Sequence, residues 1–332
     1  MATNVRAATQ TGAATAGTIP REVNNFYDRA LLEKATPAFV HNAYAQVRDI
    51  PRNSGTNVIK FRRYGLLTAN TTALTESVTP SGQNLSVTDL VATVAAYGDY
   101  VTLSDVVSYE TMDPILTEVA ELLGTQAGDS IDQLCRDVAA ATTTKQYAST
   151  AVSTVTVAAA MKISRAEVKE AVRTLQGNNA KPISQMVNPS TGYNTTPINR
   201  AFIGIISEDT LYDLDDATGW IPVEKYPNKS DVMANEVGSL AGVRFVMTTN
   251  AKVRSGEGAG SIDVHSTLIL GMYALAQTRI SGETLRNIVK PLGSAGTSDP
   301  LDQRQTSGWK LTYVAKVLND AFILDLQHAV SS

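Results

Sequence analysis

The feature that most constrains this chain is a long polar segment held between two β-rich runs. The first run is Lys60-Phe61-Arg62-Arg63-Tyr64, and the second spans residues 87–103. The segment between them, up to Gln83, is rich in Thr, Asn and Gly and has too few apolar side chains to pack on itself. Loops longer than about 12–15 residues in compact domains are usually functional or disordered. The segment therefore predicts an arm that lies on something outside its own subunit, and a neighbouring copy of the same chain is the simplest candidate.

The composition is that of a globular chain with few charges. The chain has 332 residues, of which 43% are apolar and 18% charged, so it can form two modest domains or one elaborated domain. Low charge suits a surface that partners largely cover, although an ordinary neutral globule has the same composition. The single cysteine, Cys135, excludes a framework of internal disulfides and fits a reducing compartment. It lies in an apolar helical stripe, so we expect a buried, inert thiol.

The sequence predicts a soluble protein made in the cytosol, without a membrane partner. Residues 1–20 lack the charged head and apolar block of a secretory leader and are typical of a mobile tail. No run approaches the roughly 20 apolar residues needed to span a bilayer.

Charge is segregated along the chain. Residues 1–63 carry 9 Lys and Arg against 4 Asp and Glu, whereas residues 64–143 carry one, Arg136, against 11 acids. Either the basic segment of one copy meets the acidic segment of another, or the two segments meet within one chain. The net charge of −4 argues against a dedicated nucleic-acid binder. The candidate subunit-interface residues are Lys60, Arg62, Arg63, Tyr64, Glu76, Glu118 and Glu121.

A long spine helix is predicted from Asp113-Pro114, which supplies an N-cap and a proline at the first helical position. Apolar residues then recur every three to five positions, which predicts a helix of about 36 Å up to Val138. The apolar stripe consists of Ile115, Val119, Leu122, Ala127, Ile131, Leu134 and Val138. The opposite, acidic face carries Glu118, Glu121, Asp129, Asp132 and Asp137.

The other predicted elements are shorter. A second helix begins after Ser164, which forms a capping box with Glu167, and ends at Gly177. Helical pieces broken near Pro37 are expected within residues 21–47, and turn signals lie at Thr79–Gly82. Further predictions are strands at 201–206, 243–248 and 267–276, a short helix at 209–214, a loop at 291–308, and a closing pair of strands within 311–326, broken at Asn319-Asp320.

The sequence predicts no catalytic residue, cofactor or metal ion, and therefore no enzyme. The glycine-rich run Gly256–Gly260 resembles a phosphate cradle only superficially, because coil and strand follow it instead of a helix. His41, His265 and His328 lie in no recognisable metal-ligand spacing. The chain contains neither a Gly-x-Ser-x-Gly elbow nor a Gly-x4-Gly-Lys-Ser/Thr loop.

Several segments, in conserved order along the chain, resemble the N-four-type major capsid proteins of tailed bacteriophages. The resemblance lies in Phe61–Leu67, Leu74–Gly82, Tyr97–Tyr100, Asp113-Pro114, Ser298–Leu301, Gln303-Arg304, Trp309-Lys310 and Leu318–Ala321. It runs from about residue 26 to the C-terminus.

The resemblance implies an α+β chain with the Hong Kong ninety-seven-type major capsid fold. The implied parts are a flexible tail (1–25), an N-arm (26–52), an extended E-loop (53–104), a peripheral domain with the long spine helix (105–175), an axial domain (176–300) and a C-terminal return to the peripheral domain (301–332). The sequence departs from part of the family in having no long helical prodomain before the N-arm, which implies a separate scaffolding protein.

The implied function is that of a major capsid protein. Copies of the chain would form pentamers and hexamers of an icosahedral virion head, assembled in the host bacterial cytoplasm around double-stranded DNA that they contact non-specifically. Further implied partners are the scaffolding protein and a portal. The alternative is an encapsulin-like nanocompartment shell, which has the same fold and holds protein cargo. A more distant alternative is an enzyme or adhesin module.

Overall fold

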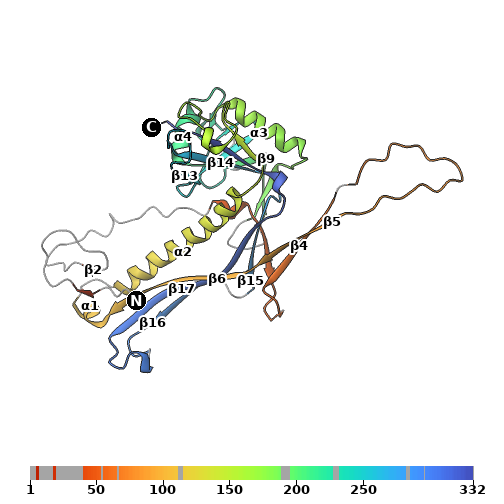
Figure 1. Ribbon diagram of the computed structural model, residues 1–332. Coiled ribbons are helices and arrows are strands. Elements are labelled where there is room, and N and C mark those ends of the chain that lie inside the picture. Colours follow the sequence, from red (N-terminus) through yellow and green to blue (C-terminus); the bar gives the residue numbers. More distant parts are fainter. Residues whose placement is uncertain are drawn as a thin grey trace.

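The computed structural model places the chain in two sheet-based units and one thin arm. It describes residues 5–6, 18–19, 40–53, 55–65, 67–110, 115–187, 195–226, 232–281, 285–294 and 296–331. Figure 1 shows a compact unit that contains the C-terminus, an elongated unit in which one long helix crosses long strands, and an arm that leaves the body. Most of the predicted tail, the predicted helical pieces before residue 40 and the Asp113-Pro114 helix start lie outside the described residues.

The elongated unit is a five-stranded sheet with helix α2 (Ile115–Ala140) on one face. Its longest strand is β17 (Arg304–Val317), which is flanked on its two edges by β6 (Ala95–Ser104) and β16 (Arg286–Lys290). Strand β15 (Leu275–Ile280) pairs with the C-terminal part of β17 and, in parallel, with β3 (Gln46–Ile50). The predicted loop 291–308 is wrong at its end, because β17 begins at Arg304. Gln305 and Ser307 are buried in this strand, and buried polar residues obscure the alternation of apolar residues that predicts a strand.

The compact unit is a nine-stranded sheet that is buried on both faces. Its central strands are β9 (Thr195–Ile206), β14 (Val264–Leu270) and β18 (Ile323–His328). One face packs towards α2 and β17, and the other is covered by α3 (Arg165–Gly177) and α4 (Glu208–Asp215). The predicted capping box of Ser164 and Glu167 is confirmed at the start of α3. The shorter elements are β1 (Val5–Arg6), β2 (Thr18–Ile19), α1 (Asp105–Glu110), β7 (Lys145–Tyr147), β8 (Ile183–Val187), β10 (Ile221–Pro222), β11 (Glu236–Leu240), β12 (Val243–Met247) and β13 (Val253–Arg254).

The chain crosses between the two sheets where the sequence predicted continuous or paired strands. The predicted strand 267–276 is two strands, because β14 ends at Leu270 in the compact unit and β15 begins at Leu275 in the elongated unit. The closing strands β17 and β18 are confirmed as strands, but they lie in different sheets and do not pair with each other. A pattern of apolar residues shows that a strand is buried but does not show which sheet it joins.

The buried stripe of α2 is displaced from the prediction. Leu122, predicted to be buried, is 49% exposed, whereas Leu123 is 5% exposed and begins a buried row. The row consists of Leu123, Ala127, Ile131, Cys135 and Ala139, spaced four residues apart. Leu134 lies at the margin and is half-buried. Ala127, Ile131 and Cys135 are buried as predicted, and the small Ala and Cys residues in the row let α2 lie close to β17.

The predicted burial of Cys135 is confirmed. Its thiol is fully buried, and this burial raises its pKa to about 12. Almost none of the thiol is ionised at neutral pH, and the thiolate is the reactive form.

Asp132 is not on the acidic outer face of α2, where the sequence placed it. Its side chain is buried and accepts hydrogen bonds from the backbone N–H groups of Val40 (3.1 Å) and His41 (2.9 Å). Its second oxygen lies 2.9 Å from Nδ1 of the buried His41 ring. Asp132 therefore fixes residues 40–41 to the middle of α2.

Two histidines lie side by side inside the compact unit. His265 and His328 are opposite each other on β14 and β18, and their ring centroids are 6.4 Å apart. Nδ1 of His328 donates to the carbonyl of Ala329 (3.0 Å), and Nε2 faces the hydroxyl of Thr267 (2.9 Å). Both ring nitrogens are therefore satisfied when the ring is neutral, and burial lowers the pKa of His328 to about 4.

The displaced stripe of α2 predicts opposite outcomes for two neighbouring substitutions. We expect Leu123→Asp to prevent soluble folding, because an unpaired buried charge costs several kcal/mol in a protein whose total stability is about 5–15 kcal/mol. Leu122→Asp should fold normally, because this side chain is half exposed. Soluble yield and thermal melting of the two variants check this. Equal damage in both variants would contradict the burial described for α2.

Protonation of His328 should destabilise the fold in acid. Its pKa in the unfolded chain is near 6.5, so between about pH 4 and 6.5 the unfolded chain binds a proton that the folded chain does not. Above about pH 6.5, His328 is neutral in both states and does not lower the free energy of unfolding. As the pH drops towards 4, the free energy of unfolding falls by up to about 3 kcal/mol, because only the unfolded chain binds the proton. Thermal unfolding across this range should show a steeper pH dependence in the wild type than in His328→Gln. The same slope in both proteins would refute the assignment.

Candidate subunit interface

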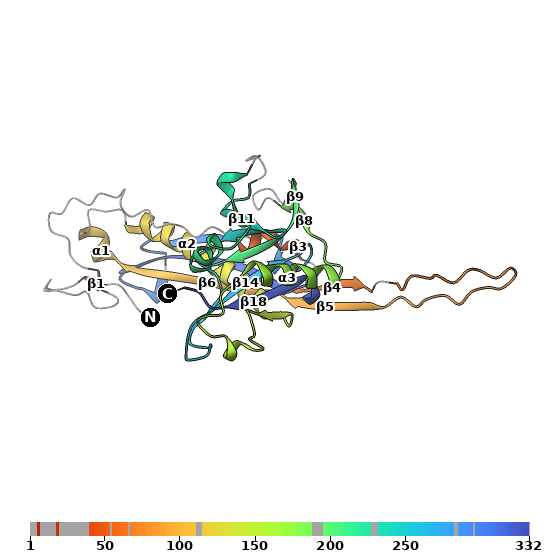
Figure 2. The same ribbon diagram turned by 90° about the horizontal axis from the view of Figure 1, so that it is seen from above.

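The arm is a two-stranded hairpin that extends beyond the body of the subunit (Figures 1 and 2). Strands β4 (Val58–Tyr64) and β5 (Val87–Thr93) pair antiparallel at its root. Residues 67–86 continue outward as two extended limbs. The side-chain amide of Gln83 joins the limbs, because it accepts from the backbone N–H of Thr68 (3.1 Å) and donates to the carbonyl of Thr68 (2.7 Å).

The apex of the arm is a tight turn from Thr75 to Val78. The N–H of Val78 donates to the carbonyl of Thr75 (3.2 Å), and Ser77 has a φ of 62°. The turn predicted at Thr79–Gly82 therefore lies a few residues earlier in the chain, at Thr75–Val78. Glu76 therefore occupies the apex itself.

The root of the arm has two different faces. Successive side chains of a strand point to opposite sides, so Lys60, Arg62 and Tyr64 share one face with Val91, Asp89 and Val87, their partners across the hairpin. On this face, hereafter the arm face, Tyr64 is 56% exposed, Val87 47% and Val91 48%. The other face includes the buried Ala92 and Arg63, whose guanidinium donates to Oδ1 of Asn319 (2.5 Å). The structure thus brings together three predicted interface residues and turns Arg63 towards its own subunit.

Arg62 forms an ion pair within its own chain. Its Nε lies 3.0 Å from Oδ1 of Asp89, and this hydrogen bond lowers the pKa of Asp89 and raises the pKa of Arg62. Both side chains are exposed, so the pair contributes little to the fold. The charge pattern left open whether the basic segment 1–63 meets the acidic segment 64–143 within one chain or between copies. The pair of Arg62 and Asp89 joins the two segments within one chain.

The predicted acidic interface residues do not lie together. Glu76 is at the exposed apex of the arm, whereas Glu118 and Glu121 are exposed near the start of α2. Figure 1 shows that this end of α2 lies next to α1, away from the arm. The arm also carries large apolar side chains that its own chain leaves exposed, namely Leu67, Leu74, Val78 and Leu85.

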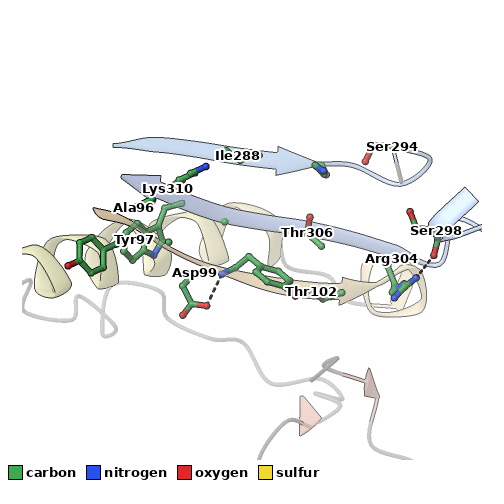
Figure 3. Close-up of a pocket in the computed structure, with 15 residues that line it drawn as sticks. Ala96, Tyr97, Asp99, Thr102, Ile288, Ser294, Ser298, Arg304, Thr306 and Lys310 are labelled. Atoms are coloured by element: carbon green, nitrogen blue, oxygen red, sulfur yellow. Dashed lines mark hydrogen bonds between the residues drawn. The ribbon is translucent and has the colours of Figure 1, made fainter. Parts of the chain in front are cut away.

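The sequence did not reveal a groove on the elongated sheet. It has a volume of about 620 Å³ and is formed by β6, β16, β17 and the turn after β16 (Figure 3). Lys310, Gly308 and Thr306 line it and alternate along β17 with residues that are buried on the α2 side of the sheet. Tyr100 lies across Gly308, where an added Cβ would approach the Cβ of Tyr100 to 2.6 Å. A pattern of alternating residues gives no signal for such a groove, because its lining combines β16 and β17 with β6, which lies far from them in the sequence.

In the described residues, the side chains and the glycine-rich run that could suggest a catalytic or binding site have structural roles. Oγ of Ser207 lies 2.9 Å from Nδ1 of His265, but it is buried and caps α4 by accepting from the N–H of Thr210. As predicted, the glycine-rich run is followed by coil and then by β14, without a helix. Within the described ranges, no group of three or more His, Cys, Asp or Glu side chains is placed to hold a metal ion. None of the helices in the described part of the chain is long and apolar enough to cross a membrane.

Comparison with known proteins identifies the fold. No family model and no curated protein matches the sequence. Among solved structures, the capsid of Ralstonia phage GP4 is similar with a TM-score of 0.72 at 13% identity, over 97% of this chain and 99% of that one. The capsid of cyanophage P-SCSP1u has a TM-score of 0.64 at 15% identity over 93% of both chains, and that of cyanophage Pam1 has 0.62 at 14% over 98% of both.

The likeness to these capsids extends over nearly the whole of each chain. The narrower resemblance to N-four-type capsid proteins stays a prediction from the sequence. The α+β fold implied by the sequence is confirmed: this chain has the Hong Kong ninety-seven-type fold of phage capsid proteins.

Proposed function

We propose that this chain is a major capsid protein that self-assembles into pentamers and hexamers of an icosahedral phage head. The observation that carries the proposal is the arm, which extends away from its own subunit within a fold that phage capsids share along their length. The similar structures reported above come from phage capsids, which favours a phage shell over an encapsulin-like compartment.

The proposed work of the protein is geometric and needs no catalytic residue. Large interfaces, summed over many copies, would stabilise the shell. We propose that the arm face and Glu76 contact neighbouring subunits, and that Glu118 and Glu121 form a separate contact at the start of α2. Arg63 would instead orient the arm through Asn319. The finer partners remain proposals from the resemblance: a scaffolding protein, a portal and packaged double-stranded DNA, with assembly in the host cytoplasm and residence in the virion head.

The parts of the subunit take their proposed names from the fold. Residues 26–52 would be the N-arm, 53–104 the E-loop with the exposed arm, 105–175 the peripheral domain and 176–300 the axial domain. Strand β18 lies in the same sheet as β9 and β14. We therefore propose that the axial domain also includes β7, α3 and residues 323–328, and that β15 and β16 belong with β17 to the peripheral domain.

Removing the arm should abolish assembly and spare the fold. Residues 65–86 are replaced by Asn-Gly, which closes a two-residue hairpin between the paired Tyr64 and Val87. We expect a melting temperature within a few degrees of the wild type, because none of the described residues in the removed limbs belongs to the core. Sedimentation and negative-stain microscopy should show shells of the wild type and only free subunits of the variant.

The two readouts separate the possible failures. A wild type that stays monomeric at high protein concentration, with and without a crowding polymer, would count against the capsid function. Cooperative loss of the whole fold on removing the arm would show instead that the arm belongs to the core of its own subunit.

A further inference from the structure

We propose that the groove on the elongated sheet receives the arm apex of a second copy, with Glu76 bound between Lys290 and Lys310. This inference rests on the proposed function and specifies its contact. In this contact the arm supplies the negative charge and the groove the positive charge. The sequence pattern had suggested the opposite, a basic arm on an acidic surface.

The apex presents one carboxylate between two exposed apolar side chains. Glu76 is the only charged residue in residues 65–88. Leu74 on one side is 75% exposed and Val78 on the other is 61% exposed. Exposed apolar residues that gather at one place mark an interaction site more often than scattered ones do. The apex therefore requires a surface that combines apolar area with positive charge.

The groove has that combination. Lys290 and Lys310 are exposed, and neither has an ion pair within the described part of the chain. The half-exposed apolar side chain of Ile288 lies on β16, two residues before Lys290, in the same row as Gly308 of β17 and Tyr100 of β6. Figure 3 shows Ile288, Lys310 and Thr306 along the two neighbouring strands.

The acids near the groove are already used. Asp99 accepts from the N–H of Tyr100 (2.9 Å) and from the side-chain amide of Gln126 on α2 (2.8 Å). Asp299 is buried and accepts from the backbone N–H of Arg304 (2.8 Å), and its carboxylate also lies 3.7 Å from the Arg304 guanidinium. Asp99 keeps its negative charge, but its carboxylate faces α2 through Gln126, and Asp299 is offset by Arg304. The positive charge that faces the groove is therefore mainly that of the two lysines.

The charged groups at the root of the arm favour an acidic apex over the reverse arrangement. Arg62 is paired with Asp89 and Arg63 donates to Asn319. A basic arm would therefore act mainly through Lys60, whereas the apex itself is acidic.

A nucleic-acid backbone is the other chemistry that two lysines attract. Such binding depends on neutralising several phosphates, whereas this groove has two unpaired lysines around an apolar centre. A short hairpin with one carboxylate and two aliphatic side chains satisfies both parts of the groove.

Disulfide trapping tests the contact directly. The native Cys135 is buried and does not compete, so Glu76→Cys is combined with Lys290→Cys and particles are assembled in reductant, then oxidised with diamide. Diamide takes up the two thiol protons and two electrons as the S–S bond forms. We expect covalent chains of subunits on a non-reducing gel. The matched control combines Glu76→Cys with Lys316→Cys, which is exposed on β17 but does not line the groove, and should stay uncrosslinked.

Charge reversal supplies an independent test. Glu76→Lys, and separately Lys290→Glu with Lys310→Glu, should each slow assembly measured by light scattering about tenfold or more, with unchanged melting of the free subunit. Combining all three changes should restore most of the rate. The exposed control Glu257→Lys should have no effect.

The outcomes decide between the explanations. Particles that form normally but give no specific cross-link, or variants without mutual rescue, overturn this contact and leave the capsid function standing. Nuclease-sensitive binding of DNA that is lost in Lys290→Glu with Lys310→Glu, without a cross-link, would assign the groove to nucleic acid instead. Failure of the reduced double-cysteine protein and of the wild type to form particles would count against the proposed function itself.

Discussion

The close packing of α2 on β17 is the contact on which the rest of this subunit depends. The small residues Ala127, Cys135 and Ala139 let the helix lie near the sheet, and Trp309 and Leu311 of β17 fill the space beneath it. The same helix extends to the compact unit, so its core includes residues of both sheets. A connection of this kind fixes the orientation of one unit relative to the other, and the proposed role in a shell would require this because small angular errors accumulate over many copies.

Asp132 adds a polar anchor to this packing. A buried carboxylate is costly unless its oxygens are hydrogen-bonded, and here three hydrogen bonds from residues 40 and 41 meet that requirement. Breaking the anchor by removing either partner would leave the other one buried and unpaired. The start of the described body, at residues 40 and 41, is therefore tied to the centre of the spine helix.

The arm shows the opposite physical character. Its root packs one face on the body and keeps the ion pair of Arg62 and Asp89 on the other. Its limbs hold each other through Gln83 and bury no core. A two-stranded hairpin alone is marginally stable in water, so a surface on another copy would order it on assembly. In the proposed contact, the aliphatic side chains of the apex would be buried in the groove and Glu76 would bind the two lysines. The burial would contribute affinity, and the charges would fix the register of the arm.

The sequence by itself determined the local features: the arm, the spine helix, the capping box of α3 and the lack of a recognisable catalytic motif. These depend on composition and on spacing within a few residues, and the resemblance added the fold. The tertiary structure alone decided that Leu123 instead of Leu122 is buried, that Asp132 faces inward, and that Arg63 turns to its own subunit. It also decided that consecutive strands enter different sheets and that β6 forms one groove with the distant β16 and β17. The physical reason is that the burial of a side chain and the pairing of a strand depend on which surfaces meet in the folded chain. A contact between two distant segments leaves no periodic pattern in the sequence of either segment.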